Sequence, residues 1–568
     1  MSELLTTVAL LFIIAGPFLL VANRFDLPTV PFLILAGIVA GFVVEEALTL
    51  ELAQFGIALL VFTFGVGIDL SSSRLVLRDS EVAAVAQIFV VGVVGVGFGL
   101  VVGVPLSESV YLGIAAALSS TIVATALVRT EIRRSLVRGR LAESIQLVQD
   151  LFAILVLLVL GAGTLAPDPI ALQIGYGVSL LILAVLINRY LYDVVERLAG
   201  GSDELLIIGV VSLLVVFVAA AELSGVSIVV GAFAAGLAVR HDPVEHLGLF
   251  NGIESIKDFF LAIFFVTVGA LVVLPFVEMG PAASVEKLAV VAGLVVLTAV
   301  IKPIITTLIL VYRGYESRSA TLTSLSIDQV SEFALIIAIE ALILGLLSQA
   351  VFDAIILAAA VTMITSNLTQ RHNERIYRRV AQLGLISEQH GKIDEQSSVP
   401  DDLADHVVIV GYGRHGQQLV ETCEALDRPC VVIENDPVMF DAVADECDAY
   451  VFGDAMERYT WTKANVEDAT LVVSTIDSDP VSKRLLSLSF DADLMLRTND
   501  VSRALEYLGR GALYVSISDL LASEHVIQQM RSLFETELTP EELREERRAE
   551  LTEYAEMVDR NTAGPSDD

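Results

Sequence analysis

Several side chains of types that can exchange protons or bind cations lie inside apolar stretches of this sequence. Asp150 and its neighbour Gln149 are in the stretch from Glu143 to Leu160, and apolar residues continue after them. A charge near the middle of a membrane-spanning helix costs roughly 2.5–3.5 kcal/mol, so such a residue normally faces a partner or a water-filled cavity on an ion or proton path. The alternative is an aspartate at a helix end that reaches the interface, and the apolar residues after Asp150 argue against it.

Low dielectric surroundings favour the neutral form of a carboxyl group, so a buried Asp150 would hold either a proton or a desolvated cation. Mutual exclusion at one site that faces each side in turn is enough for exchange. Because Gln149 stands beside the carboxylate where a second acid would carry another charge, the simplest cycle swaps one cation for one proton. Lys302, in the middle of another apolar stretch, would pair with Asp150 or with Glu332, release a proton itself, or extend to the interface.

Two of the apolar stretches are interrupted by polar residues. The first interruption holds Ser119, Ser120 and Thr121, and the second holds Ser326, Asp328, Gln329, Ser331 and Glu332. Broken helices at matching positions of two repeats indicate a transport site near the membrane midplane. Small polar residues that only pack between helices are the alternative, which does not explain Asp328 and Glu332.

These residues belong to a series of about thirteen apolar stretches that fill the chain to about residue 370, each long enough to cross about 30 Å of hydrocarbon. We expect a polytopic α-helical membrane protein built from two inverted repeats with crossed, broken helices. Arginines recur in alternate connections, and the connections between them are almost free of basic residues, with Lys287 as the exception. The N-terminus is therefore expected outside and the C-terminal part in the cytoplasm. The predicted spans are 4–22, 28–44, 51–68, 82–104, 109–128, 142–162, 170–188, 204–222, 226–240, 258–277, 285–311, 325–347 and 350–369.

The rest of the chain is charged, and the whole sequence has a formal net charge of −34. Acid of this density argues against nucleic acid as a partner, because nucleic acid needs basic patches. An acidic surface poor in lysine is typical of halophiles. The three cysteines show no metal-site spacing and are expected to be reduced.

Residues 406–426 indicate an apolar strand, a glycine-rich turn and a helix, as in a Rossmann-like α/β domain. Gly411 allows the tight turn, Gly413 lets phosphates approach the backbone, and Gly416 lets helix and strand pack closely. Glu434 ends the next strand, about 20 residues on, where an acidic side chain binds a ribose diol. This favours NAD(H) or AMP as the ligand.

Three further residues are candidates for this nucleotide site. Asp454 follows the third predicted strand. Arg414 and His415, inside the turn, would contact phosphates or be solvated. A dehydrogenase would need a substrate domain with a catalytic residue, and no stretch is left over for one, so we expect a regulatory sensor.

The membrane half resembles the Kef branch of the monovalent cation:proton antiporters. The matching segments are GVGIDL (65–70), LSSTIVATALV (118–128), VQDLFAI (148–154), FFVTVGALV (264–272), Lys302 and DQVSEFALII (328–337). The resemblance implies a dimerisation part and a mobile core, with Asp150 as carrier, Gln149 and Thr121 lining the site, and Lys302 approaching it. Val330 and Ser331 replace the usual Gly-Gly before Glu332. The C-terminal domain is similar to the Trk-type NAD-binding domain that regulates potassium conductance.

We therefore predict a transmembrane antiporter domain (1–370), a linker (371–403), a nucleotide-binding domain (404–532) and an acidic tail (533–568). The expected function is exchange of protons for potassium, or secondly sodium, by a homodimer in the cell membrane. A nucleotide-gated potassium channel is an alternative, but its Thr-Val-Gly-Tyr-Gly filter loops are lacking. A membrane-tethered oxidoreductase is a second alternative.

Overall fold

The computed structural model divides the chain into two compact units, which are described separately. The first comprises residues 1–134 and 138–389, and the second comprises 390–568 together with 135–137. The residues that the structure describes are 3–25, 27–44, 46–68, 78–128, 137–161, 167–199, 202–240, 247–383, 391–400, 403–436, 439–535, 539–545, 547–549 and 552. Most of the predicted acidic tail (533–568), and Asp69 and Leu70 of the GVGIDL segment, lie outside the described residues.

The first unit is entirely helical in its described part, and every predicted span coincides with one helix or with two in succession. The helices are α1 (Glu3–Arg24), α2 (Thr29–Ala40), α3 (Glu46–Gly67), α4 (Arg78–Val101), α5 (Leu106–Ala117), α6 (Thr121–Leu127), α8 (Val137–Leu160), α9 (Pro167–Leu186), α10 (Tyr192–Ala199), α11 (Asp203–Leu223), α12 (Ile228–Leu237), α13 (Leu247–Ala270), α14 (Pro281–Val296), α15 (Lys302–Tyr312), α16 (Ser317–Ser326), α17 (Glu332–Ile343) and α18 (Gln349–Gln382). Short π-helical turns, η2 (Ile187–Leu191) and η3 (Leu297–Ile301), join α9 to α10 and α14 to α15.

By length and composition alone, the described residues contain 9 stretches able to cross a membrane. The expected polytopic helical class is thus confirmed. The shorter apolar helices α2 and α12, the more polar α13 and the broken pair α16–α17 complete the predicted set. α18 continues beyond the predicted span to Gln382, so the first part of the predicted linker is helical.

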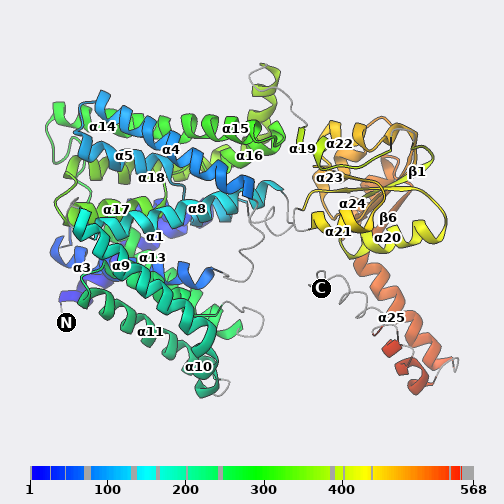
Figure 1. Cartoon of the computed structure of the whole chain (residues 1–568), viewed down its shortest axis with the longest axis horizontal. Coiled ribbons are helices and arrows are strands. Elements are labelled where there is room, and N and C mark those ends of the chain that lie inside the picture. Colours follow the sequence, from blue (N-terminus) through cyan, green and yellow to red (C-terminus); the bar gives the residue numbers. More distant parts are fainter. Residues whose placement is uncertain are drawn as a thin grey trace. The chain divides into compact units, whose positions relative to one another are not determined.

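The helices pack in two groups (Figure 1). In what we call the scaffold group, α13 packs on α1, α2 and α3, and α12 packs on α3, α9 and α11. In the core group, α4 packs on α5 and α15, and α18 packs on α14, α16 and α17. The scaffold helices approach very closely, since a Cβ on Gly37 of α2 would lie 2.1 Å from the carbonyl oxygen of Val266 in α13.

The second unit is a parallel six-stranded sheet in the order β3-β2-β1-β4-β5-β6. This is the doubly wound order, and the strand order reverses between β1 and β4, where such folds bind their ligands. The strands are β1 (His406–Val410), β2 (Cys430–Glu434), β3 (Tyr450–Phe452), β4 (Ala469–Ser474), β5 (Asp493–Thr498) and β6 (Tyr514–Ile517). The helices between and after them are α20 (Arg414–Ala425), α21 (Phe440–Glu446), α22 (Arg458–Lys463), α23 (Asp479–Leu485), α24 (Val501–Gly509) and α25 (Ser518–Phe534), with α19 (Gly391–Glu395) before the sheet (Figure 1).

Candidate functional site

Two chain interruptions meet inside the core group. α5 stops at Ala117 and α6 starts at Thr121, while α16 stops at Ser326 and α17 starts at Glu332. Each second half-helix is capped by a serine: Ser120 Oγ accepts from the N–H of Val123 at 3.2 Å, and Ser331 Oγ accepts from the N–H of Phe333 at 3.0 Å. Such caps satisfy amides that a helix start leaves unpaired. The two interruptions also contact each other, because the Ser119 hydroxyl donates to the carbonyl of Ile327 at 2.9 Å.

Asp150 lies on α8 beside the start of α6, and 1% of the residue is exposed. Its Oδ2 accepts a hydrogen bond of 2.7 Å from the hydroxyl of Thr121. Its Oδ1 is buried and has no hydrogen-bond partner among the described residues. The carboxyl group is therefore anchored on one side and has one oxygen for a proton or cation on the other.

Gln149, the neighbour of Asp150, is held at both ends of its amide. Its Oε1 accepts from the N–H of Ser119 at 2.8 Å, and its Nε2 donates to Oε1 of Gln87 at 2.7 Å. Gln87 in turn donates to the carbonyl of Ala117 at 2.9 Å. Sequence reasoning missed Gln87, whose only signal was a lone amide within the apolar α4.

Glu332 is the first residue of α17 and points to the other half-helix. Its Oε1 accepts from the N–H of Ile122 at 3.2 Å, in the first turn of α6. A carboxylate in this position compensates the positive end of the helix dipole. Glu332 also lies near enough to Asp150 for their charges to interact.

We call the place where the two interruptions meet the helix crossing. Lys302 contacts it on the side of the first half-helices, α5 and α16. The ammonium donates to the carbonyls of Leu118 at 3.0 Å and Gln329 at 2.8 Å, and to the hydroxyl of Ser119 at 3.2 Å. Leu118 and Gln329 follow the C-terminal ends of α5 and α16, where the helix dipole is negative. Lys302 thus hydrogen-bonds to neither of the partners that the sequence suggested, Asp150 and Glu332, and the charge that interacts with it is Asp328.

Asp328 and Gln329 fill the second interruption, and both are fully buried. Gln329 Nε2 donates to the carbonyls of Ser120 at 3.2 Å and Ser326 at 3.3 Å, and its Oε1 accepts from Ser366 of α18. Gln329 therefore ties both interruptions to the long helix α18. The departure at Val330 and Ser331 is accommodated, because Ser331 caps α17 and the Val330 N–H donates to Thr362 at 3.2 Å.

Carboxylate, hydroxyl and carbonyl oxygens gather at this crossing, and these are the ligands that hard cations prefer. Among the described residues, no group of three histidine, cysteine or acidic side chains is placed to hold a metal ion. The arrangement offers compensated helix ends and buried carboxylate oxygens that have no hydrogen-bond partner among the described residues, on Asp150, Asp328 and Glu332. It suits a cation that is bound weakly and exchanged.

In the second unit, the three predicted glycines lie where β1 turns into α20. Gly411 has a φ of +92°, in the region that favours glycine. A Cβ on Gly416 would lie 2.0 Å from the Gly411 carbonyl oxygen, so only glycine fits there. Gly413 begins α20 without a side-chain cap, and a Cβ on it would point into open space. The start of α20 is thus accessible to an anion.

Glu434 ends β2, next to the glycine turn. Its carboxylate accepts from the backbone N–H groups of Tyr412 at 2.6 Å, Asn435 at 2.7 Å and Asp436 at 2.8 Å. Burial raises the pKa of the Glu434 carboxyl, and these three donors oppose that rise. The side chain therefore fixes the turn itself as well as facing the edge where a ribose would bind.

Asp454 follows β3, and its Oδ1 accepts from the N–H of Met456 at 2.8 Å. It shapes the local turn one residue after Gly453, whose N–H donates to the Glu434 carbonyl at 2.8 Å. Asp454 thus lies near the C-terminal end of β2, where Glu434 is.

His415 lies in the first turn of α20, next to Arg414, and meets a residue that sequence reasoning missed. Nη1 of Arg497, on β5, lies 2.8 Å from His415 Nδ1. Arg497 also donates to the Thr475 carbonyl at 3.3 Å and to the Ser518 hydroxyl at 3.0 Å. Burial and the Arg497 charge lower the pKa of His415, so its ring is neutral near pH 7. The signal for Arg497 was a charge at the end of an apolar strand.

Known proteins resemble both units. The putative cation/proton antiporter YbaL of Escherichia coli (strain K12) is 27% identical over 94% of this chain and 98% of its own length. The K(+) efflux antiporter 4 of Arabidopsis thaliana is 24% identical over 60% of this chain and 59% of its own length. The sodium proton antiporter MjNhaP1 of Methanocaldococcus jannaschii shares the fold, with a TM-score of 0.50 at 13% identity over 66% of this chain and 99% of that chain.

Two family models match the chain. Residues 407–509 match the TrkA-N domain. Residues 7–371, more than half of the chain, match the sodium/hydrogen exchanger transmembrane family. The chain therefore belongs to the sodium/hydrogen exchanger family and carries a C-terminal TrkA-N domain.

Proposed function

We propose that this protein exchanges protons for a monovalent cation across the membrane, potassium first and sodium second, under the control of a nucleotide bound to its C-terminal domain. The observation that carries the proposal is the Asp150 carboxyl group. It is buried beside two broken helices, with one oxygen bound to Thr121 and the other without a partner among the described residues. Relatives named as antiporters support the same function.

Exchange follows from competition at Asp150. A proton neutralises the carboxyl group, and a desolvated cation neutralises the carboxylate, so each excludes the other. When the core group moves against the scaffold group, the loaded site would change the side of the membrane to which it opens. The hydroxyl of Thr121 would orient the carboxyl group in both loaded states.

A one-for-one, electroneutral cycle is supported by Gln149 and Lys302. Both polar atoms of the Gln149 amide are bound, to Ser119 and to Gln87, and an amide does not titrate. The three donors of the Lys302 ammonium are all used on backbone carbonyls and the Ser119 hydroxyl. In this proposal, Asp150 is the group that changes charge during transport.

The TrkA-N domain would sense NAD(H) or AMP. The open start of α20 would bind the phosphates, and Glu434 would accept hydrogen bonds from the ribose. The ligand would bias the carrier by binding one of its states more tightly than the other. A membrane-tethered oxidoreductase, the alternative from another class, predicts hydride transfer by the protein.

We also propose that the protein is a homodimer, with its C-terminal domain in the cytoplasm and its N-terminus outside. α24 exposes Val501, Leu505 and Leu508 along one side, and α25 exposes Ile527, Met530 and Phe534. Apolar stripes of this kind would be covered by the same surface of a second copy, around a twofold axis.

Proton flux in proteoliposomes tests the function. An imposed potassium or sodium gradient is expected to drive proton movement, which NAD(H) or AMP alters. A flux that persists when Asp150 is replaced by Asn would refute the role of this residue. A large cation current of the kind that an open pore carries, without coupled proton exchange, would favour the potassium channel instead.

A further inference from the structure

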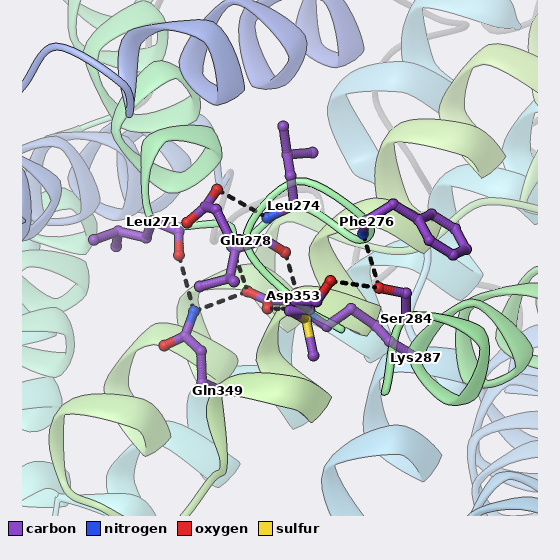
Figure 2. A network of polar contacts seen from close by, with 10 residues as sticks. Leu271, Leu274, Phe276, Glu278, Ser284, Lys287, Gln349 and Asp353 are labelled. Carbon is purple, nitrogen blue, oxygen red and sulfur yellow. Dashed lines mark hydrogen bonds and ion pairs between the residues drawn. The ribbon is translucent and has the colours of Figure 1, made fainter. Parts of the chain in front are cut away.

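A buried ion pair lies in the core group, away from the helix crossing. Lys287 of α14 pairs with Asp353 of α18, and 4% and 0% of these residues are exposed (Figure 2). Breaking such a pair is costly because it leaves a buried charge without compensation, whereas an apolar pair of similar size is often tolerated. Neither residue contacts the Asp150 site, so the ion pair needs another explanation.

The pair hydrogen-bonds to the backbone of residues 271–280, which connect α13 of the scaffold group to α14 of the core group. Lys287 Nζ donates to the carbonyl of Val273 at 2.9 Å, and Asp353 Oδ1 accepts from the N–H of Val273 at 3.3 Å. The carbonyl and the N–H of Val273 are thus bound by Lys287 and Asp353, respectively. Gln349 adds two hydrogen bonds to this network, because its side chain donates to the Leu271 carbonyl and to Asp353, each at 2.8 Å (Figure 2).

The same connection is held in a strained shape. Phe276 has a φ of +61°, which a bulky residue adopts only where its surroundings enforce it. Its N–H donates to the hydroxyl of Ser284 in α14 at 2.8 Å (Figure 2). Among the described residues, the side chains that fix the connection from outside it all belong to core helices: Ser284, Lys287, Gln349 and Asp353. At its start, the N–H groups of Leu271 and Val272 donate to the carbonyls of Val268 and Gly269 in α13, at 3.4 and 3.2 Å.

The connections at 69–77 and 162–166, which also join the two groups, lie outside the described residues. The α13–α14 connection is described throughout. If the core group moves against the scaffold group, as the proposed function requires, some part of this connection must bend. Its hydrogen bonds to the core begin at Leu271, directly after α13 ends at Ala270.

We propose that Lys287 and Asp353 are positioning residues that lock the α13–α14 connection onto the core group. The connection then moves as part of the core, and bending is confined to the end of α13. This inference rests on the proposed exchange function. Releasing the connection would let the core move without a fixed pivot and would slow transport while leaving Asp150 intact.

Distances between spin labels test the lock in the full-length protein, with the three native cysteines replaced by serine. One label at Val277 and one at Leu346, after α17, report on the connection against the core. A second pair, Val277 with Leu223 at the end of α11, reports on the connection against the scaffold. We expect a single narrow distance distribution for the first pair, which Asp353→Asn broadens. A distribution that stays narrow in this variant would overturn the proposal.

A double variant separates the lock from simple charge compensation. Lys287→Met with Asp353→Leu removes both charges, so thermal stability should recover toward the native value. The Val273 backbone remains unbound, however, so the broad distribution should persist and cation-driven proton flux should stay about tenfold below the native rate. Recovery of both stability and a narrow distribution would show that the pair only compensates charge.

Glu278→Gln is the matched control. Glu278 lies in the same connection, and among the described residues its side chain accepts from the nearby Leu274 N–H alone, at 3.2 Å, so removal of its charge should change neither distance. Broadening equal to that in Asp353→Asn would count against a specific lock. If the native protein shows no exchange at all, the proposed function fails, and the label distances still decide the inference.

Discussion

The starts of two helices, α6 in the membrane unit and α20 in the TrkA-N domain, present opposite chemistry. In the membrane unit, the start of α6 is capped by Ser120. Glu332 accepts from the N–H of Ile122 in its first turn, and Asp150 accepts from the hydroxyl of Thr121. At α20 in the TrkA-N domain, Gly413 gives no side-chain cap and leaves open space. The positive end of a helix dipole is the same in both places.

The difference shows how the side chains around a helix start select its ligand. Where carboxylates of the chain itself already compensate the dipole, a further anion is repelled and the carboxylate oxygens can take a proton or cation. Where glycine leaves the amides uncovered, the start of the helix takes an anionic phosphate.

The largest effect is expected at the membrane site. Asp150→Asn keeps the hydrogen bond to Thr121 but removes the titrating charge, so cation-driven proton flux should fall to the level of empty liposomes. Thermal unfolding in detergent should stay close to that of the native protein. Undiminished flux would show that the carboxyl group of Asp150, beside the start of α6, is not the carrier. Thr121→Val is the milder companion and should weaken the apparent affinity for the cation.

The next effect is expected at the start of α20. Gly416→Ala places a Cβ against the Gly411 carbonyl, so calorimetric binding of NAD(H) to the solubilised full-length protein should be lost. Gly413→Ala meets no neighbouring atom, so it should leave folding intact and weaken binding only because it crowds the phosphate. Equal loss of stability in both variants would contradict this division. Basal exchange should survive in each, without a response to the nucleotide.

A moderate effect is expected from Glu434. Glu434→Gln replaces a charged acceptor by a neutral one and should weaken NAD(H) binding by about tenfold. Because burial raises the pKa of this carboxyl group, acidification should protonate it at a higher pH than an ordinary glutamate and weaken binding in the native protein. The Gln variant should lack this pH dependence in calorimetric titrations. A ligand with a phosphate on the ribose 2′ position should bind less well to the native protein.

The smallest effect is expected from His415. Its pKa is lowered, so near neutral pH the ring is uncharged and accepts a hydrogen bond from Arg497. His415→Ala should therefore change nucleotide affinity by only about twofold, the effect of one neutral hydrogen bond. Binding that strengthens on acidification in the native protein, but not in this variant, would show instead that a charged imidazole contacts the phosphates.

Much of the fold was predictable because hydrophobic length and glycine spacing are properties of single segments. Every apolar stretch became a helix or a broken pair, and the three glycines became the β1–α20 turn. These features depend little on how one helix is rotated against another.

The partners of individual side chains were less predictable, because they depend on helix rotation and depth. Lys302 had two plausible carboxylates in the sequence, yet its ammonium binds backbone carbonyls, which no sequence pattern marks. Gln87 and Arg497 had no spacing partner that would single them out. Lys287 was the exception among the connections expected to lack basic residues, and its ion pair with Asp353 becomes visible only when α14 and α18 are seen together.

The continuous helix α18 gives the molecule a stiff rod. Its 34 residues extend for about 50 Å without a break. One end carries Asp353, the middle carries Ser366 beside the helix crossing, and the other end runs into the segment that precedes the TrkA-N domain. A conformational signal that arrived at residue 382 would therefore have one unbroken helix between it and the residues beside Ser366.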